Sequence, residues 1–296
     1  MKSNMTIGKS NLFNRIILGL KQKPLKVCLS IFVAYAAIWT ILEPLLGIVP
    51  AAVQYLSGEL KFVVLLIISI LIGLYRSAVP VDLSILYGNS VIKILFGDLF
   101  AFDGITAIPV SRHFFETEVV TTSLQHKVIQ SFVQSQEGTK GFDVYEKRLS
   151  IALENESYKE IYRGNTQIPE KYYSLGASAF LDIRGQDYLL FALTESEVKG
   201  YIPKDNCNVS KMWTALEVFW RSARIHSRGN SVNIPLIGSG VTGIRLNPRQ
   251  ILELNLLAIS NAIEEAGKIT TEEIRIILHP KYIDILNLND FQSLWK

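Results

Sequence analysis

The sequence predicts an α/β protein in two parts, an N-terminal hairpin of two transmembrane helices followed by a three-layer α/β/α sandwich with a mixed sheet. Two observations lead to this fold class. Two uncharged apolar runs lie near the N-terminus, and after them short apolar runs alternate with segments of helical periodicity. The expected parts are a leader at 1–23, the two helices within 24–80, and the sandwich at 82–296.

The first apolar run holds 16 uncharged residues between Lys26 and Glu43, and the second holds 14 between Lys61 and Arg76. Each run is shorter than the roughly 20 residues that a spanning helix needs. Long basic side chains at the ends can reach the membrane interface, so we expect helices at about 24–46 and 57–79. The alternative is a buried helical hairpin in a water-soluble protein.

The net charge of +3 is unevenly distributed. Residues 1–26 hold six bases and no acid, and residues 27–81 hold two of each, which leaves 22 bases and 25 acids in 82–296. By the positive-inside rule, this asymmetry predicts a multi-pass protein of the cell membrane whose N-terminus and C-terminal domain are both cytoplasmic. The acidic balance of the C-terminal domain argues against nucleic acid as a partner.

The leader contains apolar residues at helical spacing, on a face formed by Leu12, Phe13, Ile16, Ile17 and Leu20. This pattern is typical of an amphipathic helix at a membrane surface, and a frayed basic tail is the alternative. The two predicted spans carry no charged residue or histidine at mid-span that would relay ions. Two short helices do not line a pore alone, so any conduction requires a homo-oligomer.

The segments after residue 90 alternate between strand and helix, as a layered α/β domain requires. We expect strands at 91–96, 104–110, 231–237 and 274–278, a strand hairpin of 173–183 with 187–193, and helices at 123–135, 209–227 and 247–267. Residues 138–170 are expected to mix a helix with loops, and a short helix from about Lys281 is expected to end the domain.

A glycine-rich segment follows the strand at 231–237 and precedes the helix that opens at Asn247. Its glycines allow sharp turns and close approach of a ligand, and successive free N–H groups in such a loop form a cradle for phosphate. The segment lacks the βαβ unit of a dinucleotide fingerprint and the Lys-Ser/Thr of a P-loop, and a plain turn is the alternative. The residues expected to bind ligand here are Gly238, Ser239, Gly240, Val241, Thr242 and Gly243.

Two further features stand next to predicted strands. Asp98 follows the strand at 91–96, where a carboxylate can accept a hydrogen bond from an exocyclic amine; an Asx turn is the alternative. Gly176 lies in a turn that enters the strand ending at 183.

The two cysteines, Cys28 and Cys207, are too few for a disulfide framework, and the four histidines show no metal-ligand spacing. We therefore expect no metal and no cofactor.

Together these features resemble the macro domain family over about residues 90–296. The family's Asp that binds adenine matches Asp98 in the motif Gly97-Asp98-Leu99, and its diphosphate loop matches residues 235–243. The aromatic residue that follows the family's last strand matches Tyr282. The resemblance implies that this domain binds ADP-ribose or a related nucleotide.

The sequence departs from hydrolytic macro domains after the second strand. Those proteins carry an Asn-Ala-Ala-Asn-like run and a glycine-rich loop, where this chain has Ser111-Arg112-His113-Phe114 and residues 121–126. We therefore expect no catalytic residue. Arg112, Gln125 and His126, together with Ser111, are expected to be free to contact the distal group of a ligand, although a solvated Arg112 and a surface His126 are alternatives.

Two membrane helices followed by a diverged macro domain resemble the membrane-anchored effectors of bacterial Thoeris antiphage defence. In those systems a TIR-domain partner makes an ADP-ribose-containing signal, the macro domain binds it, and the effector damages the inner membrane. The resemblance implies a sensor-effector whose partners are such a signal, for example histidine-ADP-ribose, membrane lipid and further copies of the chain. A membrane-tethered ADP-ribosyl hydrolase and a passive scaffold are the alternatives.

Overall fold

The computed structural model describes residues 12–48, 59–115, 123–135, 140–162, 169–183, 185–194, 196–198, 203–205, 207–240, 244–292 and 295. The chain divides into two compact units. One consists mainly of Asp82–Leu286, and the other of Ile7–Val81 with Asn287–Leu294.

The first unit is built on a seven-stranded mixed sheet with the order β1-β2-β11-β10-β3-β7-β6. The five inner strands are parallel to one another, and each of the two edge strands, β1 and β6, is antiparallel to the strand beside it. The mixed sheet of the predicted sandwich is therefore confirmed. The strands are β1 (Asp82–Tyr87), β2 (Ser90–Phe96), β3 (Ile105–Ser111), β6 (Ser178–Ile183), β7 (Gln186–Thr194), β10 (Val232–Pro235) and β11 (Glu273–Leu278).

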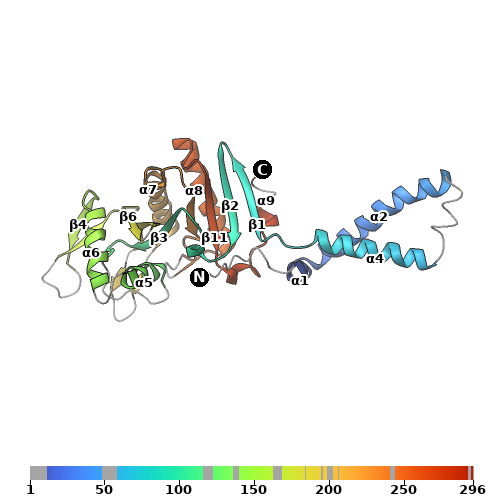
Figure 1. The fold of residues 1–296 in the computed structure, drawn as a ribbon, viewed down its shortest axis with the longest axis horizontal. Helices are drawn as coiled ribbons and strands as arrows, with labels where there is room; N and C mark the ends of the chain where they lie inside the picture. Colours follow the sequence, from blue (N-terminus) through green and yellow to red (C-terminus); the bar gives the residue numbers. More distant parts are fainter. Residues whose placement is uncertain are drawn as a thin grey trace. The chain divides into compact units, whose positions relative to one another are not determined.

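Helices cover both faces of this sheet, as expected for three layers (Figure 1). Helices α5 (Leu124–Ser135) and α6 (Lys140–Ala152) pack on one face, and α7 (Val209–Ser227) and α8 (Pro248–Ala266) lie on the other. Because both faces are covered, most residues of the inner strands are apolar, although Lys93 of β2 and Arg275 of β11 interrupt the pattern.

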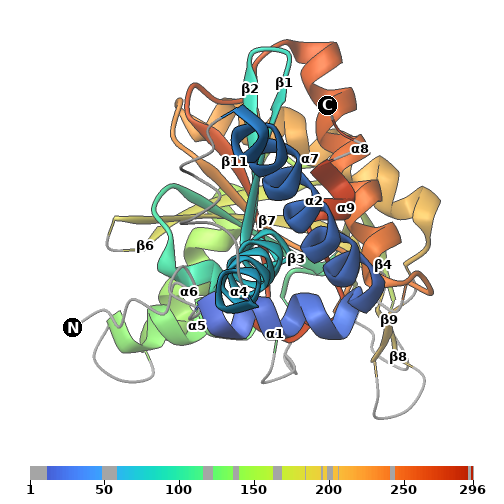
Figure 2. The ribbon, with the colours of Figure 1, turned by 90° about the vertical axis from the view of Figure 1, so that its right-hand side faces the viewer.

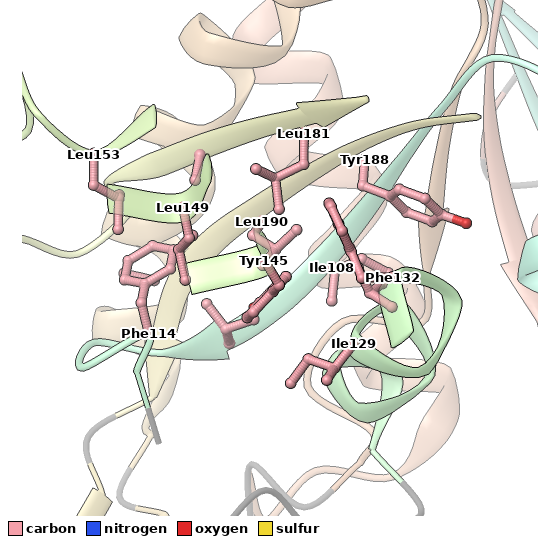
Figure 3. Packing of buried hydrophobic residues seen from close by; sticks show 14 of the residues in the cluster. Ile108, Phe114, Ile129, Phe132, Tyr145, Leu149, Leu153, Leu181, Tyr188 and Leu190 are labelled. Atoms are coloured by element: carbon pink, nitrogen blue, oxygen red, sulfur yellow. The ribbon is translucent and has the colours of Figure 1, made fainter. Parts of the chain in front are cut away.

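The core on the α5–α6 side is a continuous apolar cluster (Figure 3). Phe132 of α5 packs edge-on against Tyr145 of α6, with the ring centroids 5.4 Å apart. Both rings belong to a cluster that includes Ile108 of β3 and Leu190 of β7. On the opposite face Phe191 of β7 contacts Phe219 of α7, with the ring centroids 4.4 Å apart.

Local capping explains why two helices begin where the sequence predicts. The side chain of Asn208 accepts a hydrogen bond from the Lys211 amide at the start of α7. Asn247 and Gln250 form a reciprocal capping box at the start of α8, with Pro248 at the first helical position. These side chains satisfy backbone N–H groups that the helices cannot pair internally.

The structure adds elements that were not predicted, and it changes the C-terminal one. Strand β1 is new, and the expected final helix from Lys281 is instead a 3₁₀ turn followed by a four-residue helix. The side chain of Asn287 accepts a hydrogen bond from the Asn289 amide, so a local bond competes with helical pairing there. The remaining short elements are η2 (Leu99–Ala101), β4 (Tyr158–Ile161), β5 (Glu170–Tyr173), β8 (Ser196–Val198), β9 (Pro203–Asp205), η3 (Pro280–Tyr282) and α9 (Asn289–Gln292).

The second unit contains α1 (Leu12–Gln22), α2 (Pro24–Ile48) and α4 (Glu59–Arg76). Residues 12–22 are helical, so the frayed-tail alternative is wrong for them. Within the described residues, α2 has the length and composition of a membrane span over Pro24–Pro44, whereas the apolar stretch of α4, Phe62–Arg76, is shorter. The second predicted span therefore stays a prediction.

Helices α2 and α4 pack closely through small side chains. A Cβ atom on Gly73 would lie 2.7 Å from the Ile31 backbone nitrogen, so only glycine allows this approach. One turn earlier, Ser69 is buried, and its hydroxyl donates a hydrogen bond to the Leu65 carbonyl oxygen of the same helix. Small residues four apart are the usual means by which membrane helices bring their backbones together.

Helix α1 is fixed to the segment that follows α4. The Arg15 Nε donates to the Val79 carbonyl oxygen (2.9 Å), and the Val79 amide donates to the Arg15 carbonyl oxygen (3.2 Å). Gly19 faces Ser77 so closely that a Cβ there would overlap the Ser77 carbonyl oxygen. At the junction of α1 and α2, Lys23 forms an ion pair with Asp290 of α9.

We expect Phe132→Ala to lower the free energy of unfolding by about 3 to 5 kcal/mol, because it opens a cavity in the α5–α6 core. The matched control Ile151→Ala removes an exposed side chain of α6 and should change the free energy of unfolding by less than about 0.5 kcal/mol. Thermal unfolding of both full-length variants in detergent measures the difference. Equal shifts would contradict the packing of α5 on the sheet.

Candidate functional site

The carboxyl ends of the five parallel strands lie at one edge of the sheet, and most of the predicted site residues are there. Asp98 follows β2, Ser111 ends β3, the glycine loop (residues 238–243) follows β10, and Tyr282 follows β11. Ligands of open α/β sheets bind outside the carboxyl ends of the strands, most often where strand order reverses. The topology therefore brings together residues that are far apart in the sequence.

The first turn of the glycine loop is held from inside the domain. Leu236 accepts hydrogen bonds from the Ser239 amide (3.2 Å) and hydroxyl (2.6 Å). Gly238 has φ +96°, and a Cβ there would lie 3.0 Å from the Met212 sulfur and 3.1 Å from Ile244. Gly238 is therefore required by backbone conformation and packing together.

A buried side chain of α8 supports the same turn from below. The amide nitrogen of Asn255 donates to the Ile237 carbonyl oxygen (3.0 Å) and to the Ile251 carbonyl oxygen (2.7 Å). Sequence reasoning missed Asn255. Its signal was a polar residue on the buried face of α8, between Leu252 and Ile259.

Gly240 differs from Gly238 in its surroundings. It is exposed, and apart from its chain neighbours no atom of the described residues lies within 4 Å of the position that a Cβ would take. Val241, Thr242 and Gly243, the other predicted loop residues, lie outside the described residues.

Tyr282 links two of the strand ends. It lies in η3, is largely buried, and its hydroxyl donates to the Ser239 carbonyl oxygen at 3.3 Å. Since η3 follows β11 and Ser239 follows β10, this bond joins the glycine loop to the neighbouring strand end. A displacement of either segment would therefore stretch or break this hydrogen bond.

Asp98 shows the Asx turn, one of the two roles that the sequence left open. Its carboxylate accepts a bond from the Phe100 amide (3.3 Å) and caps η2, which is the expected Asx geometry. The residue is nevertheless exposed, whereas Leu99 beside it is buried. A carboxylate has about four lone-pair directions, so one capping bond leaves others for a donor from outside.

Arg112 and Gln125, which are expected to contact the distal group of a ligand, both form hydrogen bonds within the protein. The Arg112 Nε donates to the Tyr173 carbonyl oxygen (2.6 Å), and its Nη1 lies 3.1 Å from the Tyr172 hydroxyl. Its guanidinium carbon also lies 3.9 Å from the centroid of the Tyr172 ring. Gln125 is buried and donates to the Phe114 carbonyl oxygen (2.9 Å). Contact of either side chain with a ligand remains a prediction.

The other predicted residues of this region also have internal contacts. The buried hydroxyl of Ser111 accepts a hydrogen bond from the His113 backbone amide (3.3 Å). The Nε2 atom of the His126 ring lies 2.9 Å from the side-chain Nε2 atom of Gln130. Gly176 has φ +80°, and a Cβ there would overlap Val218 of α7. Close packing of α7 therefore accounts for glycine at this position.

Resolved pKa shifts lie at both edges of the sheet. Arg275 pairs with Asp103 (2.6 Å) and Glu273 (2.5 Å) near the amino ends of β3 and β11, and its hydrogen bond lowers the pKa of Asp103. Burial raises the pKa of Tyr173, whose carbonyl oxygen binds Arg112. Within the described part of the chain, no group of three or more His, Cys, Asp or Glu side chains is placed to hold a metal ion.

Gly238→Ala should destabilise the protein by about 1 to 3 kcal/mol, because alanine is strained at φ +96°. Gly240→Ala, the matched control, should change the free energy of unfolding by less than about 0.5 kcal/mol. Thermal unfolding of the two variants tests the different roles assigned to the two glycines. The assignment is wrong if Gly240→Ala is the more damaging change.

Comparison with known proteins gives a family match over this domain. The family model described as the macro domain of Thoeris protein ThsA matches residues 92–279, which is more than half of the chain. A comparison with curated proteins gave no match.

Solved structures with a related arrangement include two macrodomains. The Oceanobacillus iheyensis macrodomain with MES bound has a TM-score of 0.47 at 10% identity, over 72% of this chain and 96% of that chain. The Trypanosoma brucei macrodomain in complex with ADP-ribose has a TM-score of 0.38 at 10% identity, over 65% of each chain. The family membership rests on the family model alone.

Proposed function

This chain belongs to the Thoeris protein ThsA macro-domain family, and from that premise we propose that it senses an ADP-ribose-type nucleotide and acts on a membrane in response. The observation that carries the proposal is the edge formed by Asp98, Gly240 and Tyr282. Their environments fit the parts of such a nucleotide.

The adenine is assigned to Asp98. Its exposed carboxylate follows β2 directly, where it can accept a hydrogen bond from the exocyclic amine of the base. The capping bond to Phe100 fixes the backbone beside it, so the carboxylate is held in place before a ligand arrives.

The diphosphate is assigned to the glycine loop. The sheet domain is acidic overall, so an anionic ligand must be attracted locally by backbone N–H groups rather than by the field of the whole domain. Open space at Gly240 permits that approach, while Gly238, Asn255 and Tyr282 hold the turn in position.

Binding without hydrolysis is favoured by the residues at the end of β3. No asparagine stands in the Ser111–Phe114 segment, and Arg112 and Gln125 are bonded to backbone carbonyl groups. We therefore propose a sensor with no catalytic residue. Ser111, Arg112, Gln125, His126 and Gly176 would line the distal end of the site.

The response is assigned to α2 and α4 as a transmembrane hairpin. Gly73 of α4 packs closely against α2, and most of the large apolar side chains of the two helices, such as Phe32 and Leu71, are exposed. That distribution suits lipid contact better than a buried hairpin of a water-soluble protein. The charge pattern favours a cytoplasmic N-terminus and a cytoplasmic sheet domain at a bacterial inner membrane.

The proposed sequence of events starts with a TIR-domain enzyme that makes the signal, for which histidine-ADP-ribose is our expected candidate. The ligand must bind one conformer or oligomer more tightly than the other, because equal affinity shifts no population. In the favoured state, hairpins of several copies associate and disrupt the bilayer.

Calorimetry on the full-length protein in nanodiscs tests the binding site. Asp98→Ala should weaken ADP-ribose binding about tenfold or more, since hydrogen bonds to charged groups contribute about 1.5 to 3 kcal/mol. Gly240→Val should also weaken it, by occupying the open space. The control Asp143→Ala removes an exposed acid from the first turn of α6 and should leave affinity unchanged.

No binding of ADP-ribose or its histidine conjugate would overturn the sensor proposal. Turnover of an ADP-ribosylated protein by the same preparation would instead favour the hydrolase alternative.

Liposomes containing the full-length protein test the response. Addition of the nucleotide should release an entrapped dye, and Asp98→Ala should suppress release at the same nucleotide concentration because fewer sites are filled. Release that does not depend on nucleotide would contradict the proposed coupling. Binding without release would favour a passive scaffold.

A further inference from the structure

Helix α1 carries large apolar side chains that are exposed. Phe13 is 65% exposed, Leu12 42% and Leu20 41%. With Ile16 and Ile17, which are half-buried, they form one face of the helix. A face of this kind in contact with water is unfavourable, so it indicates a partner.

An adjoining edge of α1 packs against protein. Arg15 and Gly19 are one turn apart on this edge, and they contact Val79 and Ser77. The two hydrogen bonds between Arg15 and Val79 fix the helix's rotation about its own axis. The apolar face is therefore held outward by specific contacts.

The orientation of α1 within its unit is the second observation. In Figure 1, α2 and α4 run across the page and α1 is seen nearly end-on. In Figure 2, α1 lies across the page and α4 is seen nearly end-on. Helix α1 thus lies crosswise to the helices that form the proposed hairpin, as a helix lying in a membrane surface would.

Basic residues gather at the same end of the hairpin. Gly73 contacts Ile31, so the last turn of α4 lies beside the first turns of α2. Lys21 and Lys26 flank the junction of α1 and α2 and are exposed, and Arg76 ends α4. Bases at the end of a span are attracted to anionic lipid headgroups.

We propose that α1 lies in the surface of an anionic bilayer, with its apolar face among the upper acyl chains and its bases among the headgroup phosphates. Continuity favours lipid over a second copy of the chain. Helix α1 ends at Gln22 and α2 begins at Pro24, so α1 is anchored where the span meets the headgroups. This inference rests on the membrane hairpin of the proposed function, but not on the nucleotide.

Site-specific fluorescence on the full-length protein tests the inference. An environment-sensitive dye is attached to Phe13→Cys on the apolar face, to Lys21→Cys outside it, or to Phe32→Cys within α2, each in a Cys28→Ser background. The Cys28→Ser protein alone reports any labelling of buried Cys207. Each protein is reconstituted in vesicles of phosphatidylglycerol and phosphatidylcholine, without nucleotide.

The dye at position 13 should be quenched by a lipid that carries a nitroxide high on its acyl chain. Its quenching by aqueous iodide should be several-fold weaker than that of the dye at position 21. In vesicles of phosphatidylcholine alone, protection at position 13 should decrease because the bases lose their partners. Unchanged protection there would overturn the requirement for anionic lipid.

The position 32 dye separates this inference from the proposed function. If it is shielded while the position 13 dye is open to iodide, the surface role of α1 is wrong and the hairpin stands. If the position 32 dye is itself open to iodide, the membrane hairpin fails and the inference fails with it. Shielding at position 13 without quenching by the nitroxide lipid would show that protein covers the face, which also overturns the proposal.

Discussion

Parallel hydrogen bonding of β2, β11, β10, β3 and β7 forces the carboxyl ends of all five strands to one edge of the sheet. Every candidate contact depends on that arrangement. Asp98 and Tyr282 are separated by most of the domain in sequence, yet β2 and β11 are neighbours in the sheet. Antiparallel pairing of either strand would place one of these residues at the opposite edge.

The glycine loop shows how a rigid support and an open surface are built into the same few residues. Gly238 is fixed by its backbone conformation and by Met212, and the turn is bonded to Asn255 and Tyr282. Gly240, two residues later, is open. Under the proposed function, such a fixed turn would lower the entropic cost of binding a ligand at its open end.

Much of the fold could be predicted because its signals are local. The strands β2 and β11 are mostly apolar, each with one base in its middle, and Asn208 and Asn247 cap their helices within one turn. The surroundings of the site residues could not be predicted in the same way. Arg112 bonds to Tyr173, and Asn255 bonds to Ile237, which are contacts that only the folded chain creates. Residue type and spacing identified candidate positions, but they could not show which polar groups were already bonded.

The pairing of β2 with β11 also has a consequence for biosynthesis. Val91 pairs with Glu273, so β2, near the start of the domain, cannot form this pairing until β11, near the end, has been synthesised. Synthesis proceeds from the N-terminus, and α2 and α4 are therefore complete long before the sheet can close. Each new chain passes through a period in which its apolar helices exist without a finished sheet domain. Under the proposed function, no nucleotide could control the helices during that period, because the strand ends that would bind it are not yet assembled.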